Sequence, residues 1–249
     1  MNRLCGKTMM VDILTLFPEM FDSPFDSSII KRARAKELID LNTINIRDYA
    51  IDKHHQVDDS PYGGGCGMVM KADVLGRAIE SLKKENTWTI YMSPQGKPLV
   101  QDKVVELSEK PHLVLLCGHY EGIDNRIMDL IDEEVSIGDY ILTGGEIPAL
   151  VLVDAIVRLI PGVLGDDRSV EEESFDSSLL EYPHYTRPQT YEDKSVPEVL
   201  LSGHHENIRL WRKKQSLLNT FLKRPDLLIN REYTQEEKKL LMEIIFDRE

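Results

Sequence analysis

The sequence predicts an α/β fold built on a mainly parallel sheet, followed by a smaller all-helical domain. From about Met10 to Ile160, short apolar runs alternate with helical patterns, as expected for strands joined by crossover helices. The segment GDDRSVEEE that follows is acidic and almost without apolar residues, which is typical of a linker. We therefore expect an α/β domain over 1–164, a linker over 165–173 and a helical domain over 174–249.

The expected elements follow from hydrophobic periodicity. The predicted strands cover 11–17, 44–50, 87–92, 113–117 and 135–142. The predicted helices of the first domain cover 28–39, 72–84, 101–109 and 124–131, and a last one begins near Pro148 and ends before Pro161. In the second domain, helical patterns cover 203–223 and 234–246, and Thr234 with Glu237 has the spacing of a capping box.

Composition excludes several classes of protein. The chain has 249 residues, of which 41% are hydrophobic and 29% charged, as in ordinary globular proteins. Its three cysteines lie far apart, without the spacing of a zinc site or the even number of a disulfide framework. No apolar run suits a signal peptide, and the most apolar stretch, 149–160, is shorter than the roughly 20 residues of a membrane span. We expect a cytoplasmic protein without a membrane segment.

Charge alone argues against a nucleic-acid partner. The formal net charge is −13, whereas phosphate binding depends on lysine and arginine. Basic runs at 31–36 and 209–214 are local exceptions, and a solvated helix face is the simplest interpretation of each.

Three glycine-containing segments follow predicted strands and predict one shared pocket. They are SPQG at 93–96, CGHYEG at 117–122, and IGDYILTGGE at 137–146. Ligands of open α/β sheets bind beyond the carboxyl ends of strands, where glycine lets backbone groups approach closely. Any one such loop could simply be a tight turn. Together, and without a dinucleotide or P-loop motif in the chain, they favour a nucleotide-like ligand held in an unconventional way.

Two further features leave alternatives open. The glycine cluster 61–67 follows His54 and His55 in a long loop, which indicates a functional or disordered segment, and adjacent histidines without regular carboxylate or cysteine spacing do not predict a metal site. Asp154 and Arg158 lie four residues apart on an apolar helix. They could form a structural ion pair or line a site.

Five longer motifs point to one family. They are SPYGGG at 60–65, CGHYEGID at 117–124, GDYILTGGE at 138–146, IPGVLG at 160–165 and YPHYTRP at 182–188. Together they resemble the bacterial TrmD family of tRNA (guanine-N1)-methyltransferases over nearly the whole chain. The resemblance implies a SPOUT-class fold with a deep trefoil knot, and a homodimer with active sites at the subunit interface. It also implies methylation, with S-adenosylmethionine, of N1 of the guanosine immediately 3′ of the anticodon, position 37, in tRNA.

The same resemblance assigns roles to residues. The cofactor residues are Met92, Ser93, Pro94, Gly118, Tyr120, Glu121, Gly122, Ile137, Gly138, Tyr140, Leu142, Gly144, Gly145 and Pro148. Guanine N1 carries a proton at neutral pH, so the reaction needs a base. The matching carboxylate is Glu173, with Glu171 and Glu172 as alternatives. Arg158 matches an arginine that stabilises negative charge on O6, and Asp154 is expected to orient it at the substrate.

The resemblance also places tRNA contacts in the second domain. The expected substrate residues there are His184, Tyr185, Arg187, Arg209 and Arg212, since phosphate contacts and stacking commonly hold single-stranded RNA. Trp211 suits either stacking or core packing. His119 stands where many relatives carry arginine, so a cationic role there would depend on pH. A Mg²⁺ ion is possible, held through RNA or water rather than by a protein cage.

Two other functions remain as alternatives. One is a SPOUT enzyme that methylates a different base or a ribose hydroxyl. The other is a binding module that has kept the knot but lost turnover. The presence of Arg158 and Glu173 argues against the second.

Overall fold

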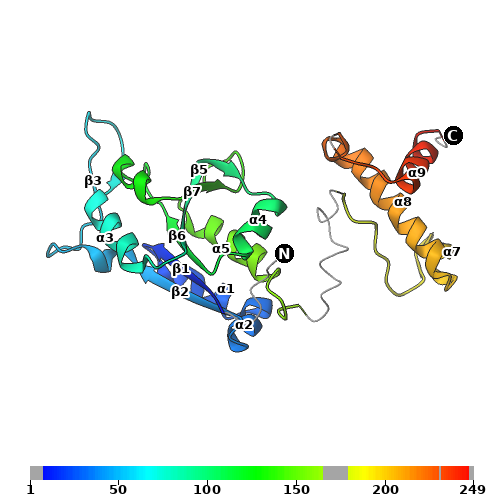
Figure 1. The fold of residues 1–249 in the computed structure, drawn as a ribbon, viewed down its shortest axis with the longest axis horizontal. Coiled ribbons are helices and arrows are strands. Elements are labelled where there is room, and N and C mark those ends of the chain that lie inside the picture. Colours follow the sequence, from blue (N-terminus) through cyan, green and yellow to red (C-terminus); the bar gives the residue numbers. More distant parts are fainter. Residues whose placement is uncertain (1–7, 165–178, 230, 247–249) are drawn as a thin grey trace. The chain divides into compact units, whose positions relative to one another are not determined.

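The chain divides into two compact units, Met1–Asp166 and Asp167–Glu249. The computed structural model describes residues 8–164, 179–229 and 231–246 (Figure 1). The predicted acidic linker, 165–173, lies outside these described residues. In the part of the chain that is described, no helix has the length and apolar character needed to cross a membrane.

The first unit is built on a five-stranded sheet in which every pairing is parallel. The strand order is β2-β1-β6-β5-β7. The strands are β1 (Met9–Thr15), β2 (Ile39–Asn45), β5 (Thr87–Pro98), β6 (His112–Cys117) and β7 (Glu133–Ser136). The α/β prediction is therefore confirmed, and the carboxyl ends of β5, β6 and β7 meet at one edge of the sheet.

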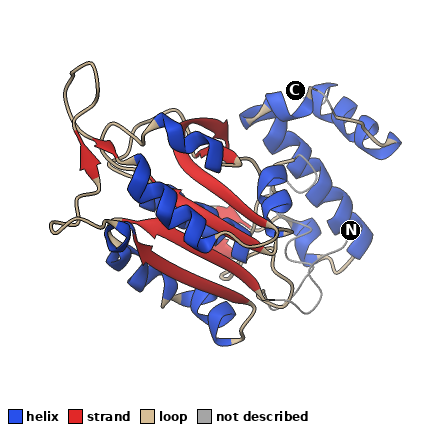
Figure 2. Ribbon diagram, turned by 60° about the vertical axis from the view of Figure 1, so that its left-hand side comes forward, coloured by secondary structure: helices blue, strands red, loops and turns tan. Residues whose placement is uncertain are grey.

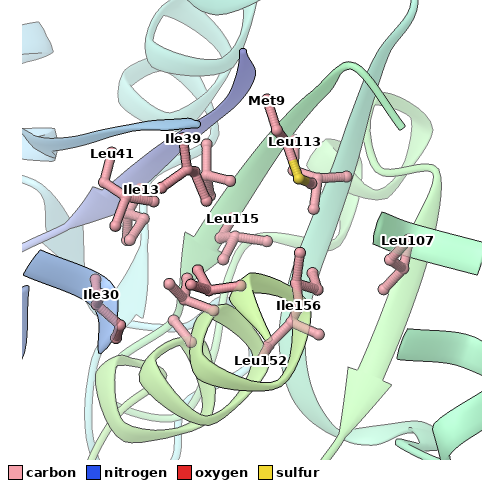
Figure 3. Close-up of a cluster of buried hydrophobic side chains, with 14 of the residues drawn as sticks. Met9, Ile13, Ile30, Ile39, Leu41, Leu107, Leu113, Leu115, Leu152 and Ile156 are labelled. Carbon is pink, nitrogen blue, oxygen red and sulfur yellow. The ribbon is translucent and has the colours of Figure 1, made fainter. Parts of the chain in front are cut away.

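Helices cover both faces of this sheet (Figure 2), which is why its strands are apolar on both sides. The helices of the first unit are α1 (Asp22–Phe25), α2 (Ser28–Ala35), α3 (Ala72–Leu82), α4 (Gln101–Ser108) and α5 (Glu146–Val157). Helices α2, α4 and α5 contribute to one core cluster, in which Leu115 of the sheet packs with Leu152 and Ile156 (Figure 3). Helix α3 covers the other face, with its own cluster around Leu75 and Leu116.

Short elements connect the strands. The 3-10 turns are η1 (Pro18–Phe21), η2 (Ile46–Tyr49) and η3 (Asn125–Leu130). A small antiparallel pair, β3 (Asp58–Asp59) and β4 (Val69–Met70), closes the base of the loop that carries the glycine cluster.

Two predicted strands differ from the structure. The strand expected over 44–50 is the end of β2 followed by η2, because the Asn45 side chain accepts a hydrogen bond from the Arg47 amide and turns the chain. The strand expected over 135–142 ends at Ser136. Gly138 has a φ of +146°, and its carbonyl accepts a hydrogen bond from the Tyr140 amide, so the rest of the segment forms a loop.

The second unit is mainly helical. Its helices are α7 (Glu198–Leu201), α8 (His205–Lys223), η4 (Pro225–Leu228) and α9 (Gln235–Phe246), and Leu179, Leu217, Leu240 and Ile244 form its core. The prediction of an all-helical domain is wrong in one detail, since β8 (Thr190–Tyr191) and β9 (Lys194–Ser195) form a hairpin. Strands of two residues are too short to leave a period-two pattern.

The predicted capping box at the start of α9 is confirmed. The Thr234 amide donates to Glu237 Oε2 at 2.9 Å, and the Glu237 amide donates to Thr234 Oγ1 at 3.2 Å. The Glu237 carboxylate, 3% exposed, also lies 2.9 Å from Lys213 Nζ and from an Arg231 guanidinium nitrogen. Burial alone would raise the pKa of this carboxyl, but the Lys213 hydrogen bond, the Thr234 amide and the two cations lower it to about 2.

Replacing Glu237 by glutamine should lower the free energy of unfolding of the second unit by about 1–3 kcal/mol near neutral pH, because three buried contacts lose a charged acceptor. The depressed pKa stabilises the folded state above the ordinary value of 4.5, and that contribution is lost as the pH falls from there towards 2. Urea unfolding at about pH 7 and about pH 3, followed by Trp211 fluorescence in a Trp88→Phe background, measures the effect.

Glu243→Gln is the matched control, because Glu243 pairs with Lys214 on a more exposed part of the same helix. This substitution should lower the free energy of unfolding by less than about 1 kcal/mol. An equal loss from both variants, or a Glu237→Gln loss that does not shrink in acid, would contradict the assignment.

Candidate functional site

A cavity of about 500 Å³ lies at the carboxyl ends of β5, β6 and β7. Its walls come from 91–95, from 118–123 and from 134–145 except Asp139, with Asn125, Met128 and Pro148 completing it. This is the place where open α/β sheets bind ligands. Every residue that the sequence resemblance assigns to the cofactor lines this cavity, namely Met92, Ser93, Pro94, Gly118, Tyr120, Glu121, Gly122, Ile137, Gly138, Tyr140, Leu142, Gly144, Gly145 and Pro148.

Two glycines allow the walls to approach each other. The Gly145 amide donates to the Gly118 carbonyl at 3.0 Å. A Cβ on Gly145 would lie 2.7 Å from the Cα of Cys117, and a Cβ on Gly118 would lie 2.7 Å from the ring of Tyr91. A side chain at Gly145 would force the 118–123 and 134–145 walls apart, and a side chain at Gly118 would displace the ring of Tyr91 in the 91–95 wall.

A buried hydrogen-bond network lies directly behind the same walls. Glu146, 1% exposed, is the first residue of α5, and Thr15 Oγ1 donates to its Oε1 at 2.6 Å. His119 Nε2 lies 2.8 Å from both carboxylate oxygens. Burial, with the Glu146 charge adding to it, raises the pKa of the Cys117 thiol well above its ordinary value, so this cysteine is held as a neutral thiol.

The loop with the glycine cluster lies against the 118–123 wall of the pocket. The Glu121 amide donates to the Met68 carbonyl at 3.1 Å, and the Met70 amide donates to the Gly122 carbonyl at 3.0 Å. A Cβ on Gly67 would clash with the Glu121 side chain. Tyr62, at the tip of this loop, is fully exposed. Among the described residues, no group of three histidine, cysteine or carboxylate side chains is placed to hold a metal ion.

Sequence reasoning missed part of the lining. Tyr91, Ile123, Asn125, Met128 and Glu134 lie outside the segments predicted to form the pocket but also line the cavity. Tyr91 belongs to a predicted apolar strand, and its strand register places it beside Glu134. Burial, with the Glu134 charge adding to it, raises the pKa of the Tyr91 hydroxyl. Such cross-strand neighbours leave no local pattern in a sequence.

The residues expected to act on the substrate are only partly described. Arg158 is half-buried at the carboxyl end of α5, and Asp154 is exposed one turn earlier. Asp154 falls on the side of the helix that is left uncovered, and the two alternatives for this pair, a structural ion pair or the lining of a site, stay predictions. Glu171, Glu172 and Glu173 lie outside the described residues.

Aromatic and basic side chains gather in the second unit. The rings of His184 and Tyr182 lie 4.7 Å apart, the Arg212 guanidinium lies 4.8 Å over Tyr182, and Tyr185 lies 6.3 Å from Trp211. His184 also contacts Glu181 at 2.6 Å. Arg187 is exposed. Arg209 lies between two carboxylates, since Glu206 and Glu236 both accept hydrogen bonds from it at 2.8 Å.

Comparisons with known proteins give the same family over nearly the whole chain. A family described as tRNA (Guanine-1)-methyltransferase TrmD matches residues 9–230. A tRNA (guanine-N(1)-)-methyltransferase of Syntrophomonas wolfei is 68% identical over 241 residues, which cover 97% of this chain and 99% of the relative. Relatives of the same name in Carboxydothermus hydrogenoformans and Staphylococcus haemolyticus are 60% and 54% identical, with 96% and 94% of this chain and 95% and 96% of each relative covered.

Gly145→Ala should destabilise the first unit by about 1–3 kcal/mol, because the added methyl group meets backbone atoms of Cys117 that cannot rotate away. Gly145 has a negative φ of −82°, so the effect tests the close approach rather than backbone strain. Thermal or urea unfolding measures it.

The control is Gly76→Ala within α3, where the nearest atom to the new Cβ is Ile127 Cδ1 at 3.7 Å. There the gain in helix propensity should leave stability equal or higher by up to about 1 kcal/mol. Similar behaviour of the two variants would mean that the walls do not depend on glycine.

Proposed function

The chain belongs to the TrmD family of tRNA (guanine-1)-methyltransferases, and on this premise we propose that its pocket at the ends of β5, β6 and β7 binds S-adenosylmethionine. The reaction is methylation of N1 of the guanosine at position 37 of tRNA. We therefore expect the protein to act in the cytoplasm. One observation carries the cofactor assignment: residues from three segments far apart in the sequence, all expected to hold the cofactor, line the same cavity.

The chemistry of the lining fits S-adenosylmethionine. A cavity of about 500 Å³ lies within the range of small-molecule sites. Gly118, Gly122, Gly138 and Gly144 line the walls without side chains, so the polar edges of an adenosine can approach the backbone closely at these positions. Glu121 places a carboxylate on the wall, where it suits the positive charges of a sulfonium and an amino group.

Two side chains assist the reaction, one by removing a proton and the other by stabilising negative charge. The Glu173 carboxylate removes the proton from guanine N1, which makes N1 a nucleophile. The Arg158 guanidinium stabilises the negative charge that develops on O6 as that proton leaves. When bound, S-adenosylmethionine supplies the methyl group that N1 accepts. In the sequence, Arg158 comes just before the motif at 160–165 and Glu173 comes just after it. The proposed base and the proposed charge-stabilising residue therefore flank one short segment of the chain.

The path of the chain around the pocket supports a trefoil knot. Strand β7 is at the edge of the sheet, with β5 between it and β6. The residues after β7 nevertheless return to β6, where Gly145 contacts Cys117 and Gly118. The chain therefore passes back across the end of β5, and we propose that this return is threaded through the preceding loops.

The exposed face of α5 supports a homodimer. Helix α5 is apolar almost all round, yet Ile147 and Val151 are 47% and 44% exposed, and Ile141 in the preceding loop is 81% exposed. Contiguous exposed apolar side chains are typical of an interface. Asp154 continues the same stripe, and Arg158 follows one turn later. A second copy covering this stripe would bring its own surface next to Arg158, as an active site shared between subunits requires.

The second unit supplies the contacts expected for the anticodon region. Its cluster of Tyr182, His184, Tyr185, Trp211 and Arg212 combines rings and a guanidinium, which suits stacking against unpaired bases.

Transfer of labelled methyl from S-adenosylmethionine should occur to a tRNA transcript with guanosine immediately 3′ of the anticodon and not to one with adenosine there. Glu173→Gln should lower the rate at least about a hundredfold, because an amide cannot accept the N1 proton. Glu171→Gln and Glu172→Gln are the matched controls and should stay within a few-fold of the wild type. Label on both transcripts would indicate a different methyltransferase, and label on neither a binding module.

Val151→Glu should convert a dimer into monomers and abolish methyl transfer, because it places an unpaired charge in the middle of the apolar stripe. Light scattering after size exclusion measures the mass. Ile51→Glu, at another exposed apolar position of the first unit, should leave both dimer and activity unchanged. A Val151→Glu protein that remains dimeric would place the interface elsewhere.

A further inference from the structure

The Glu146 carboxylate joins three parts of the first unit. It receives a hydrogen bond from Thr15 at the end of β1 and lies 2.8 Å from His119, which follows β6. Glu146 itself begins α5. His119 belongs to the 118–123 wall of the cavity, and Glu146 directly follows the 134–145 wall. One buried charge therefore connects both walls to the end of β1.

Among the described residues, the side chains of Thr15 and His119 hydrogen-bond this charge. A buried carboxylate is costly without donors. The Thr15 hydroxyl also accepts the Phe17 amide at 2.9 Å, so its proton is directed at Glu146. The position at the start of α5 adds the favourable end of the helix dipole. His119 must then present an N–H at Nε2, since a carboxylate only accepts hydrogen bonds.

The network has little space in which to rearrange. The His119 ring packs edge-on against Phe17 with 5.0 Å between centroids. A Cβ on Gly144 would lie within 2.5 Å of both the His119 ring and Glu146 Oε2. The side chains of His119 and Glu146 thus press directly on the backbone of the 134–145 wall. A change in either side chain must move a wall of the pocket or leave the carboxylate without a donor.

We propose that Glu146 and His119 are positioning residues for cofactor binding, which fix the 118–123 and 134–145 walls at the separation that S-adenosylmethionine requires. This inference rests on the proposed function of the pocket. The link acts through a donor at position 119 rather than through contact of Glu146 with the ligand, because Glu146 is buried behind the walls.

The chain contains a matched control for a purely structural role. His112 begins the same strand β6 and is also buried, with Nε2 2.9 Å from Asp12 and Nδ1 2.7 Å from Thr87. This second histidine–carboxylate pair lies at the opposite end of the strand from the cavity. Loss of either pair should destabilise the fold, but only the pair at His119 should affect the ligand.

The experiment compares His119→Ala, His119→Gln, His112→Ala and His112→Gln by thermal unfolding, by calorimetric titration with S-adenosylmethionine, and by the kinetics of methyl transfer. His119→Ala should raise both the Kd and the KM for S-adenosylmethionine at least about tenfold, with a smaller change in kcat, because it removes a hydrogen bond to a buried charge. His119→Gln retains an N–H donor and should recover most of the affinity. Both His112 variants should lower Tm while their Kd stays within about twofold.

Two results would overturn the proposal: normal affinity in His119→Ala, or equal losses of affinity in the His119→Ala and His112→Ala proteins. If His119→Ala fails to fold, Thr15→Val removes one donor with little change of shape and should raise the Kd several-fold; an unchanged Kd would count against the network. Wild-type protein that binds no S-adenosylmethionine would instead refute the proposed function itself, which separates the two failures.

Discussion

The contact between Gly118 and Gly145 is the constraint on which the rest of the first unit depends. The hydrogen bond between their backbones brings the segment after the edge strand β7 against the end of β6, although β5 lies between these strands. Once that contact is made, α5 must start behind the pocket. The carboxylate at its first residue is then buried, and Thr15 and His119 become the donors that make its burial tolerable.

Local sequence patterns predicted what depends on local geometry. The parallel sheet and the Thr234–Glu237 capping box follow from periodicity and spacing, and both are present. The errors arose where a few hydrogen bonds override periodicity, as at Asn45, which ends β2. Glycine-rich loops after consecutive strands were enough to place a pocket, since parallel strands end at the same edge. The family motifs, rather than periodicity, supplied the individual lining residues and the expectation of a knot.

Non-local relations could not be predicted in this way. Tyr91 and Glu134 are neighbours only because of the register between β5 and β7. His119 and Glu146 are 27 residues apart, and a histidine in a loop gives no indication of its partner. The exposure of Asp154 depends on which side of α5 the sheet covers, and an almost uniformly apolar helix does not reveal that side.

An acidic chain that acts on tRNA must compensate for its own charge. In the second unit, glutamates of α8 and α9 form ion pairs with Arg209, and Glu237 forms one with Lys213. A phosphate that binds either cation would have to displace these carboxylates. The cluster around Tyr182, His184 and Trp211 does not face this competition to the same degree, because rings stack on bases without needing a net charge. If the second unit holds an unpaired anticodon loop as we propose, a chain of net charge −13 would rely more on stacking than on phosphate neutralisation.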